Sequence, residues 1–191
     1  MATTIKRLTL QEYLNYDDGT DTRYELVAGE LVAMPPESWN NSQIALFLLV
    51  QFLRFVPVNR LSNKTEIVVL GTRATTRMPD LMVISDELVE LLQGTARATI
   101  TVDMPPPNLV VEVVSPGTQN QERDYRYKRS EYAARGIAEY WIVDPERAIV
   151  TVLTLVNGLY EDAVFKGAEP IRSTVFPELM LTPEQVLKAG E

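Results

Sequence analysis

One stretch of six residues, Leu109–Val114, constrains the fold more than any other part of the chain. It reads LVVEVV, an apolar run broken only by Glu112. Runs of this kind are typical of strands that are buried on both faces of a sheet. Ser115-Pro116-Gly117 follows directly and cannot continue a strand. We therefore predict a central strand here.

Helix and strand signals alternate along the rest of the chain. Capping patterns and helical spacing predict helices over residues 9–14, 38–56, 85–92, 121–135 and from 182 onward. Strand-like runs cover residues 24–27, 30–34, 65–70, 78–84, 139–143, 149–156 and 159–165. We predict turns at Gly71 and Asn157-Gly158, and a long loop over Gln93–Asn108. Because hairpins and helical crossovers both occur, we predict one α/β domain over residues 1–191 with a mixed sheet.

Cysteine and histidine are both absent from the sequence. Disulfides, Cys-ligated metal centres and thiol chemistry are therefore excluded, and so is the commonest general base. The sequence also lacks a G-x-S-x-G nucleophile elbow and a Gly-rich phosphate loop. Any catalysis must use Asp, Glu, Lys, Arg, Tyr, Ser or Thr, with a hard cation as the natural helper. The sequence is therefore compatible with metal-assisted catalysis or with a protein that has no catalytic activity.

The charge balance and hydropathy limit the partners of the chain. Lys and Arg number 18 and Asp and Glu 26, a formal net charge of −8, which argues against nonspecific coating of nucleic acid. The longest apolar run starts at Ile44 and is cut by Gln51 and Arg54, short of the roughly 20 residues that span a membrane. Residues 1–10 lack the apolar core of a signal peptide. We expect a cytoplasmic protein without membrane contact.

Two acidic residues in or beside predicted strands are candidate metal ligands. An ionised carboxylate at Glu112 must be paired, hydrogen-bonded or bound to metal if the strand is buried. Alternatively, Glu112 faces water at the strand end or forms a structural ion pair. Asp80 follows Pro79 at the start of a strand, where it could meet a second carboxylate in an all-oxygen site. Its alternative is a turn Asp before an edge strand.

Lys128 and Glu25 are the other candidate site residues. Lys128 lies on the predicted helix after the Glu112 strand, either placed over a pocket to stabilise negative charge or exposed in an i,i+4 pair with Asp124. Glu25 looks by itself like the polar face of a hairpin. Several arginines share the helix of Lys128, either as phosphate contacts or as a solvated face.

A set of motifs then occurs in a recognisable order: Arg23–Leu31, Pro79–Leu81, Pro107–Pro116, Asp124–Lys128 with Tyr132, and Glu139–Pro145. In this combination the chain resembles the Uma-two family of restriction-endonuclease-like proteins, formerly a domain of unknown function. The resemblance covers roughly Leu8–Leu187, and its most specific part is the stretch from Leu109 to Pro145.

The resemblance implies the PD-(D/E)XK nuclease fold, a mixed sheet flanked by helices. In that pattern Asp80 and Glu112 supply the two acids. Val114 stands where a lysine is expected, and Lys128 matches a lysine that has migrated to the helix. Glu25 matches the acid on the first hairpin.

A metal-dependent nuclease is the activity that the resemblance implies. Asp80, Glu112 and the Val113 carbonyl would hold Mg²⁺ or Mn²⁺, Lys128 would stabilise developing charge, and Glu25 would bind a second metal directly or through water. We expect hydrolysis of phosphodiester bonds in DNA, with RNA as an open alternative. A non-enzymatic scaffold is the other hypothesis, because the chain is acidic and residues 38–41 lack the histidine common in the family.

We also expect a homodimer, because related nucleases often cut two strands with paired subunits. The predicted C-terminal hairpin, Ile149–Phe165, is the candidate interface.

Overall fold

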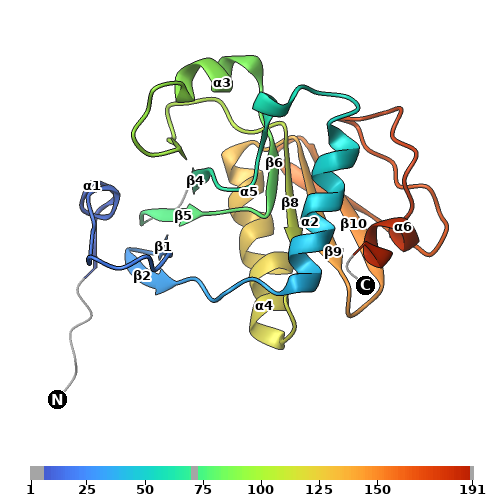
Figure 1. Cartoon of the computed structure of the whole chain (residues 1–191), viewed down its shortest axis with the longest axis horizontal. Helices are drawn as coiled ribbons and strands as arrows, with labels where there is room; N and C mark the ends of the chain where they lie inside the picture. The colour runs from blue at the N-terminus through green and yellow to red at the C-terminus, as the bar shows by residue number, and fades with distance from the viewer. Residues whose placement is uncertain (1–6, 70–72, 190–191) are drawn as a thin grey trace.

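A six-stranded sheet forms the centre of the computed structural model, which describes residues 7–69 and 73–189 (Figure 1). Its strands are β3 (Leu61–Ser62), β6 (Leu81–Val83), β8 (Leu109–Val113), β9 (Glu139–Asp144), β10 (Ile149–Val156) and β11 (Leu159–Lys166). They lie in the order β11-β10-β9-β8-β6-β3. Strand β8 is thus an inner strand, as the sequence predicts.

The sheet is mixed, because β8 and β9 run parallel and the other neighbours run antiparallel. A parallel pair needs a crossover, and here it consists of α4 (Thr118–Glu122), the π-helical segment η2 (Arg123–Lys128) and α5 (Arg129–Arg135). The antiparallel hairpin β10–β11 turns at Asn157-Gly158, where both residues have positive φ. The predicted mixed α/β architecture is confirmed.

Helices cover both faces of this sheet (Figure 1). On one face α2 (Trp39–Phe52) and α6 (Pro183–Lys188) pack over side chains that include Val111 and Val113. On the other face Tyr132 of α5 packs over Val110 and Val114. Because side chains alternate along a strand, Glu112 points to the face that α5 covers. The candidate carboxylate of Glu112 therefore faces α5 and not α2.

Two smaller sheets lie beside the central one. One is the hairpin of β1 (Tyr24–Val27) and β2 (Glu30–Ala33). The other contains β4 (Glu66–Val69), β5 (Thr75–Arg77) and β7 (Thr99–Ile100) in the order β5-β4-β7. Three further short elements are α1 (Leu10–Leu14), η1 (Val58–Arg60) and α3 (Asp86–Leu92). Helix α1 begins with the predicted capping box at Thr9.

Several predicted boundaries are wrong. The predicted loop Gln93–Asn108 contains β7, whose buried Thr99 and Ile100 pair with β4. The short strands β3 and β5 were not predicted from the sequence. The predicted strand 78–84 forms only over the residues of β6. The predicted strand 65–70 starts one residue later than predicted, with Glu66 of β4, while Leu70, Gly71 and the predicted turn lie outside the described residues.

The two long predicted helices also differ in extent. Helix α2 is capped by Ser38 but ends at Phe52, four residues before the predicted end at Val56. The helix predicted from Gln121 starts at Thr118 and passes through the π-helical η2 before it ends at Gly136, which has φ 84°. In the described part of the chain, no helix is long and apolar enough to cross a membrane.

Candidate active site

Glu112 is buried, and both of its carboxylate oxygens have protein partners. The hydroxyl of Tyr132 donates a 2.6 Å hydrogen bond to Oε1. Nζ of Lys128 lies 2.8 Å from Oε2. The alternative in which Glu112 faces water is therefore wrong, and an ion pair is present.

Lys128 is also buried, so the predicted alternative of an exposed pair with Asp124 is wrong. Its Nζ lies 3.1 Å from Oδ1 of Asp124 in addition to its contact with Glu112. Burial opposes the charge of Lys128, but the two carboxylates outweigh it and hold the pKa of the ammonium above its ordinary value. The side chain is thus a cation at neutral pH with one N–H beyond the two it uses for these partners.

The π-helical segment η2 carries both Asp124 and Lys128 toward the sheet. Oδ1 of Asp124 also lies 3.1 Å from Nε of Arg123, and Tyr140 donates a hydrogen bond to the backbone oxygen of Asp124. Single-turn π-helical irregularities are rare and occur often at functional sites. Here the irregularity lies in the turns that place a buried cation beside Glu112.

Asp80 directly precedes β6 and reaches across to β8. Its Oδ2 accepts a 2.6 Å hydrogen bond from the backbone N–H of Val113. The antiparallel register that pairs Leu81 with Val111 brings the two segments together. Burial, and next the negative charge of Glu112, raise the pKa of Asp80 well above its ordinary value. The carboxylate of Glu112 thus disfavours the charged form of Asp80.

Glu25 is buried on β1 and not on a solvent-facing hairpin surface. Its Oε2 lies 3.1 Å from NH1 of Arg77, and its Oε1 accepts a 2.9 Å hydrogen bond from the N–H of Met78. Arg77 also binds both carboxylate oxygens of Glu131, at 2.7 and 2.8 Å. Glu25 thereby fixes the chain two residues before Asp80.

One small cavity, of about 80 Å³, brings the predicted site residues together. Its lining includes Glu25, Asp80, Glu112, Val113 and Lys128. A wider groove of about 570 Å³ adjoins it and shares Asp80 and residues 34–37 as lining. The structure thus brings all of the predicted residues to one place, which an approach groove reaches from the surface.

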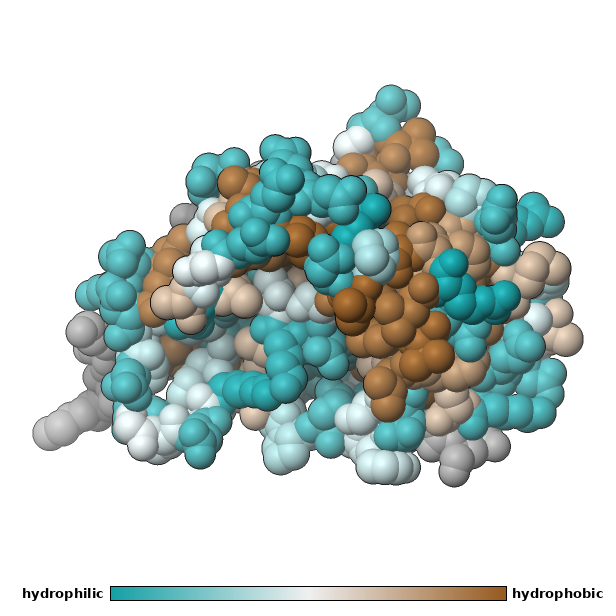
Figure 2. Space-filling view, turned by 45° about the horizontal axis from the view of Figure 1, so that its top comes forward, coloured by the Kyte–Doolittle hydropathy of each residue, from teal (hydrophilic) through white to brown (hydrophobic). Residues whose placement is uncertain are grey.

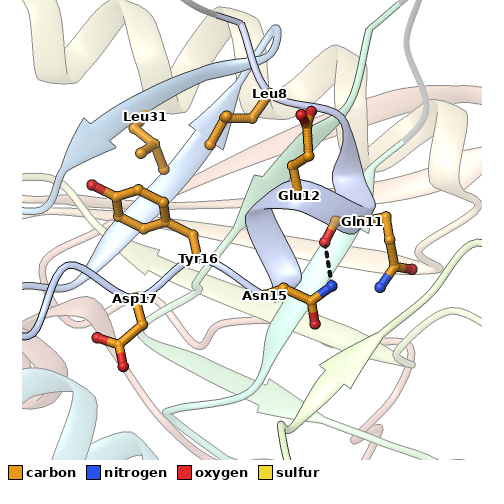
Figure 3. A pocket seen from close by; sticks show the side chains of 7 residues that line it. All are labelled: Leu8, Gln11, Glu12, Asn15, Tyr16, Asp17 and Leu31. Carbon is orange, nitrogen blue, oxygen red and sulfur yellow. Dashed lines mark hydrogen bonds between the residues drawn. The ribbon is translucent and has the colours of Figure 1, made fainter.

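A larger hollow, of about 660 Å³, lies beside α1, and none of the described residues that line it also lines this cavity. In Figure 3 the side chains of Leu8, Tyr16 and Leu31 gather on one side, and Asn15 donates a hydrogen bond to the backbone oxygen of Gln11. None of the described residues that line it is a lysine or an arginine. Its described lining thus differs from that of the small cavity, where Lys128 is paired with Glu112.

Comparison with known proteins identifies the relatives of this chain. The family model of Uma2, described as "Putative restriction endonuclease", matches residues 10–184. The chain belongs to the Uma2 family. The crystal structure of a "putative nuclease belonging to DUF820" from Anabaena variabilis has the same fold, with a TM-score of 0.74 at 17% identity over 96% of this chain and 99% of that chain. A search of curated proteins gives no match.

The oxygen atoms of this Uma2 protein suit a hard divalent cation. Asp80, Glu112 and the Val113 carbonyl would be the ligands, and each oxygen that already accepts a hydrogen bond keeps a further lone pair. Within residues 7–69 and 73–189, no group of three or more acidic side chains is placed to hold one metal. Mg²⁺ commonly binds through one or two carboxylates and retains several waters. The donor set therefore fits a partly hydrated Mg²⁺ or Mn²⁺.

Sequence reasoning missed three residues of this Uma2 site. Asn41 of α2 is buried and donates hydrogen bonds to the Val113 carbonyl at 3.3 Å and to Oγ of Ser115 at 3.2 Å. Tyr132 binds Glu112, and Arg77 binds Glu25. The motif that includes Tyr132 was a usable signal, and residues 38–41, where the family commonly has a histidine, pointed to the position of Asn41. Arg77 has ordinary sequence surroundings.

Proposed function

We propose that the chain is a metal-dependent nuclease that hydrolyses phosphodiester bonds. The observation that carries the proposal is the shared cavity of Asp80, Glu112 and the buried cation Lys128. Membership of a family described as "Putative restriction endonuclease" supports it. DNA is the proposed substrate, as the family description suggests.

A divalent cation held by Asp80, Glu112 and the Val113 carbonyl would polarise the scissile phosphate and lower the pKa of a bound water. In the reaction the water gives up a proton to solvent as its oxygen bonds to phosphorus, the bond to the leaving sugar oxygen breaks, and that oxygen takes up a proton from solvent. The ammonium of Lys128 stabilises negative charge that develops on the phosphate. Its position is fixed by Glu112 and Asp124.

Other side chains of the cavity hold the ligands in place. Tyr132 orients the carboxylate of Glu112, and the N–H of Val113 orients that of Asp80. Asn41 holds the carbonyl of Val113. We assign Glu25 a contact with a second metal, directly or through water, in addition to its bond to Met78.

The adjoining groove is the proposed path of the nucleic acid strand. Arg23 and Lys64 line it, and neither side chain has a hydrogen bond or ion pair among the described residues. Both are thus available to phosphates. Asp21 and Glu37 line the same groove, so its charge is mixed and we expect about two phosphate contacts.

Cleavage of plasmid and single-stranded DNA with Mg²⁺ or Mn²⁺ tests this function. Asp80→Ala and Glu112→Ala should abolish cleavage, whereas Glu178→Ala, which removes an exposed carboxylate elsewhere, should leave it unchanged. Circular dichroism spectra would establish that each variant is folded. Cleavage that survives in both site variants would refute the assignment.

A scaffold without enzymatic activity is the second candidate. The observation that favours it is that both carboxylate oxygens of Glu112 already have protein partners. Calorimetric titration with Mn²⁺ separates the two functions. Saturable binding that is lost in Asp80→Ala supports the nuclease, and no binding at millimolar Mn²⁺ supports the scaffold.

A further inference from the structure

The outer face of α2 is an apolar stripe that residues 7–69 and 73–189 leave exposed. Trp39, Leu46, Val50 and Leu53 follow one another at helical spacing and are 76%, 51%, 51% and 41% exposed. The opposite face of α2 packs into the core. Figure 2 shows apolar residues gathered right of centre, in the part of the molecule where Figure 1 places α2. Leu46, Val50 and Leu53 are successive on this face, and Ser42 and Gln43 lie between them and Trp39. The largest apolar patch on a monomer, typically about 300–600 Å², is often an interaction site.

Helix α2 also contains no charged side chain. None of its 14 residues is Asp, Glu, Lys or Arg, although charged residues make up 23% of the chain. A surface helix normally exposes its polar side chains. The stripe is therefore suited to an apolar partner, and it does not add to the repulsion between two copies that each carry a charge of −8.

We infer that this stripe binds the same stripe of a second copy of the chain. In a two-fold symmetric dimer the same patch faces itself, and two antiparallel α2 helices would place Trp39 of one copy near Leu53 of the other. At these exposed fractions the four side chains leave roughly 430 Å² uncovered per copy. Two copies would thus bury roughly 860 Å² from these side chains, just under the about 1,000 Å² of a specific stable interface and within the range of weak or transient dimers.

The edge strand β11 is less suited to this role. It exposes Glu161, Asp162 and Lys166, and charged side chains are a common protection of sheet edges against pairing. Its partner β10 is largely buried, so only part of the hairpin Ile149–Phe165, the interface predicted from the sequence, is exposed. The apolar stripe of α2 is the surface that favours self-association.

The dimer would also affect the groove that leads to Asp80. Leu46 belongs both to the stripe and to the lining of that groove. Leu46 is midway between Trp39 and Leu53, so the two-fold axis of an antiparallel pair passes near it. The two grooves would then lie on either side of the axis. The dimer does not depend on the proposed nuclease function, because it follows from the surface of α2.

Sedimentation velocity over about 1–100 µM protein tests the inference. The wild-type chain should reach twice its mass of 21.5 kDa, and Val50→Glu should remain at 21.5 kDa. Leu159→Glu is the matched control, because Leu159 is an exposed apolar residue at the β10–β11 turn. It should dimerise like the wild type. A wild-type monomer at 100 µM, or dissociation by Leu159→Glu with no effect of Val50→Glu, would overturn the proposal.

A cross-linking experiment keeps the test decisive if Val50→Glu fails to fold. The chain has no cysteine, so a single introduced cysteine reacts alone. Leu46→Cys should give a covalent dimer with a short bis-maleimide, and Leu159→Cys should not. A cross-link at Leu159→Cys without one at Leu46→Cys would contradict the α2 interface.

Discussion

Nζ of Lys128 lies 2.8 Å from Oε2 of Glu112, and both side chains are buried. The carboxylate comes from an inner strand and the ammonium from the π-helical segment that crosses over it. Removing one member of a buried ion pair leaves the other as an uncompensated charge. This pair therefore links the stability of the fold to the chemistry of the site.

Lys128→Met should destabilise the chain by about 3–5 kcal/mol, because it leaves Glu112 and Asp124 without their cation. Urea unfolding followed by circular dichroism measures the change. Lys188→Met is the control, since Lys188 forms an exposed i,i+4 pair with Glu184. It should cost no more than about 0.5 kcal/mol. Equal losses of unfolding free energy in the two variants would show that the buried pair stabilises the fold no more than the exposed pair does.

Asp80→Asn should make the metal-free protein more stable at neutral pH while it lowers the cleavage rate about 100-fold or more. The pKa of Asp80 is raised in the folded chain, so the folded state binds the proton more tightly than the unfolded state. The contribution of Asp80 to stability is then present at low pH. It is lost as pH rises from the ordinary aspartate pKa of about 4 through the folded-state pKa.

Urea unfolding of the wild type and Asp80→Asn between pH 4 and pH 8, without divalent metal, measures this difference. The stability advantage of the variant should grow with pH. A constant difference across the range would show that the carboxyl of Asp80 is not perturbed by burial and by Glu112.

Much of the fold follows from local signals in the sequence. The apolar run around Glu112 predicts the inner strand, Thr9 and Ser38 predict helix starts, and Asn157-Gly158 predicts the last hairpin. These features depend on residues that are neighbours in the chain. The two-residue strand β7 could not be predicted, because it exists only through its pairing with β4.

The candidate site likewise combines features that the sequence predicts with features that depend on long-range contacts. The family pattern directs attention to Asp80, Glu112 and Lys128, and the structure places them around one cavity. That Lys128 is buried depends on the π-helical turn, which has no reliable local signature. The role of Asn41 depends on a contact with Val113 across 72 positions of sequence. Long-range contacts of this kind require the folded coordinates.

Asn41→Ala should lower the cleavage rate about 10–100-fold, because a carbonyl that is no longer held by its hydrogen bond binds metal less well. Titration with Mn²⁺ should show weaker metal affinity, whereas KM for DNA should change little. The neighbouring Asn40→Ala is the control, because Asn40 makes no side-chain contact of this type among the described residues. An Asn41→Ala variant with normal Mn²⁺ affinity would assign Asn41 a purely structural role.

Arg23→Gln and Lys64→Gln should each weaken DNA binding and reduce its dependence on salt. For a single strand, each phosphate contact contributes about 0.7 to the slope of log Kobs against log salt, and for a duplex about 0.9. Two contacts predict a wild-type slope of about −1.4 with single-stranded DNA, and the loss of either contact should halve it. Fluorescence anisotropy with a labelled oligonucleotide in EDTA measures binding without cleavage. Lys166→Gln, which removes an exposed cation on β11, should leave the slope unchanged. If all three variants lower the slope equally, the groove beside Asp80 is not the path of the strand.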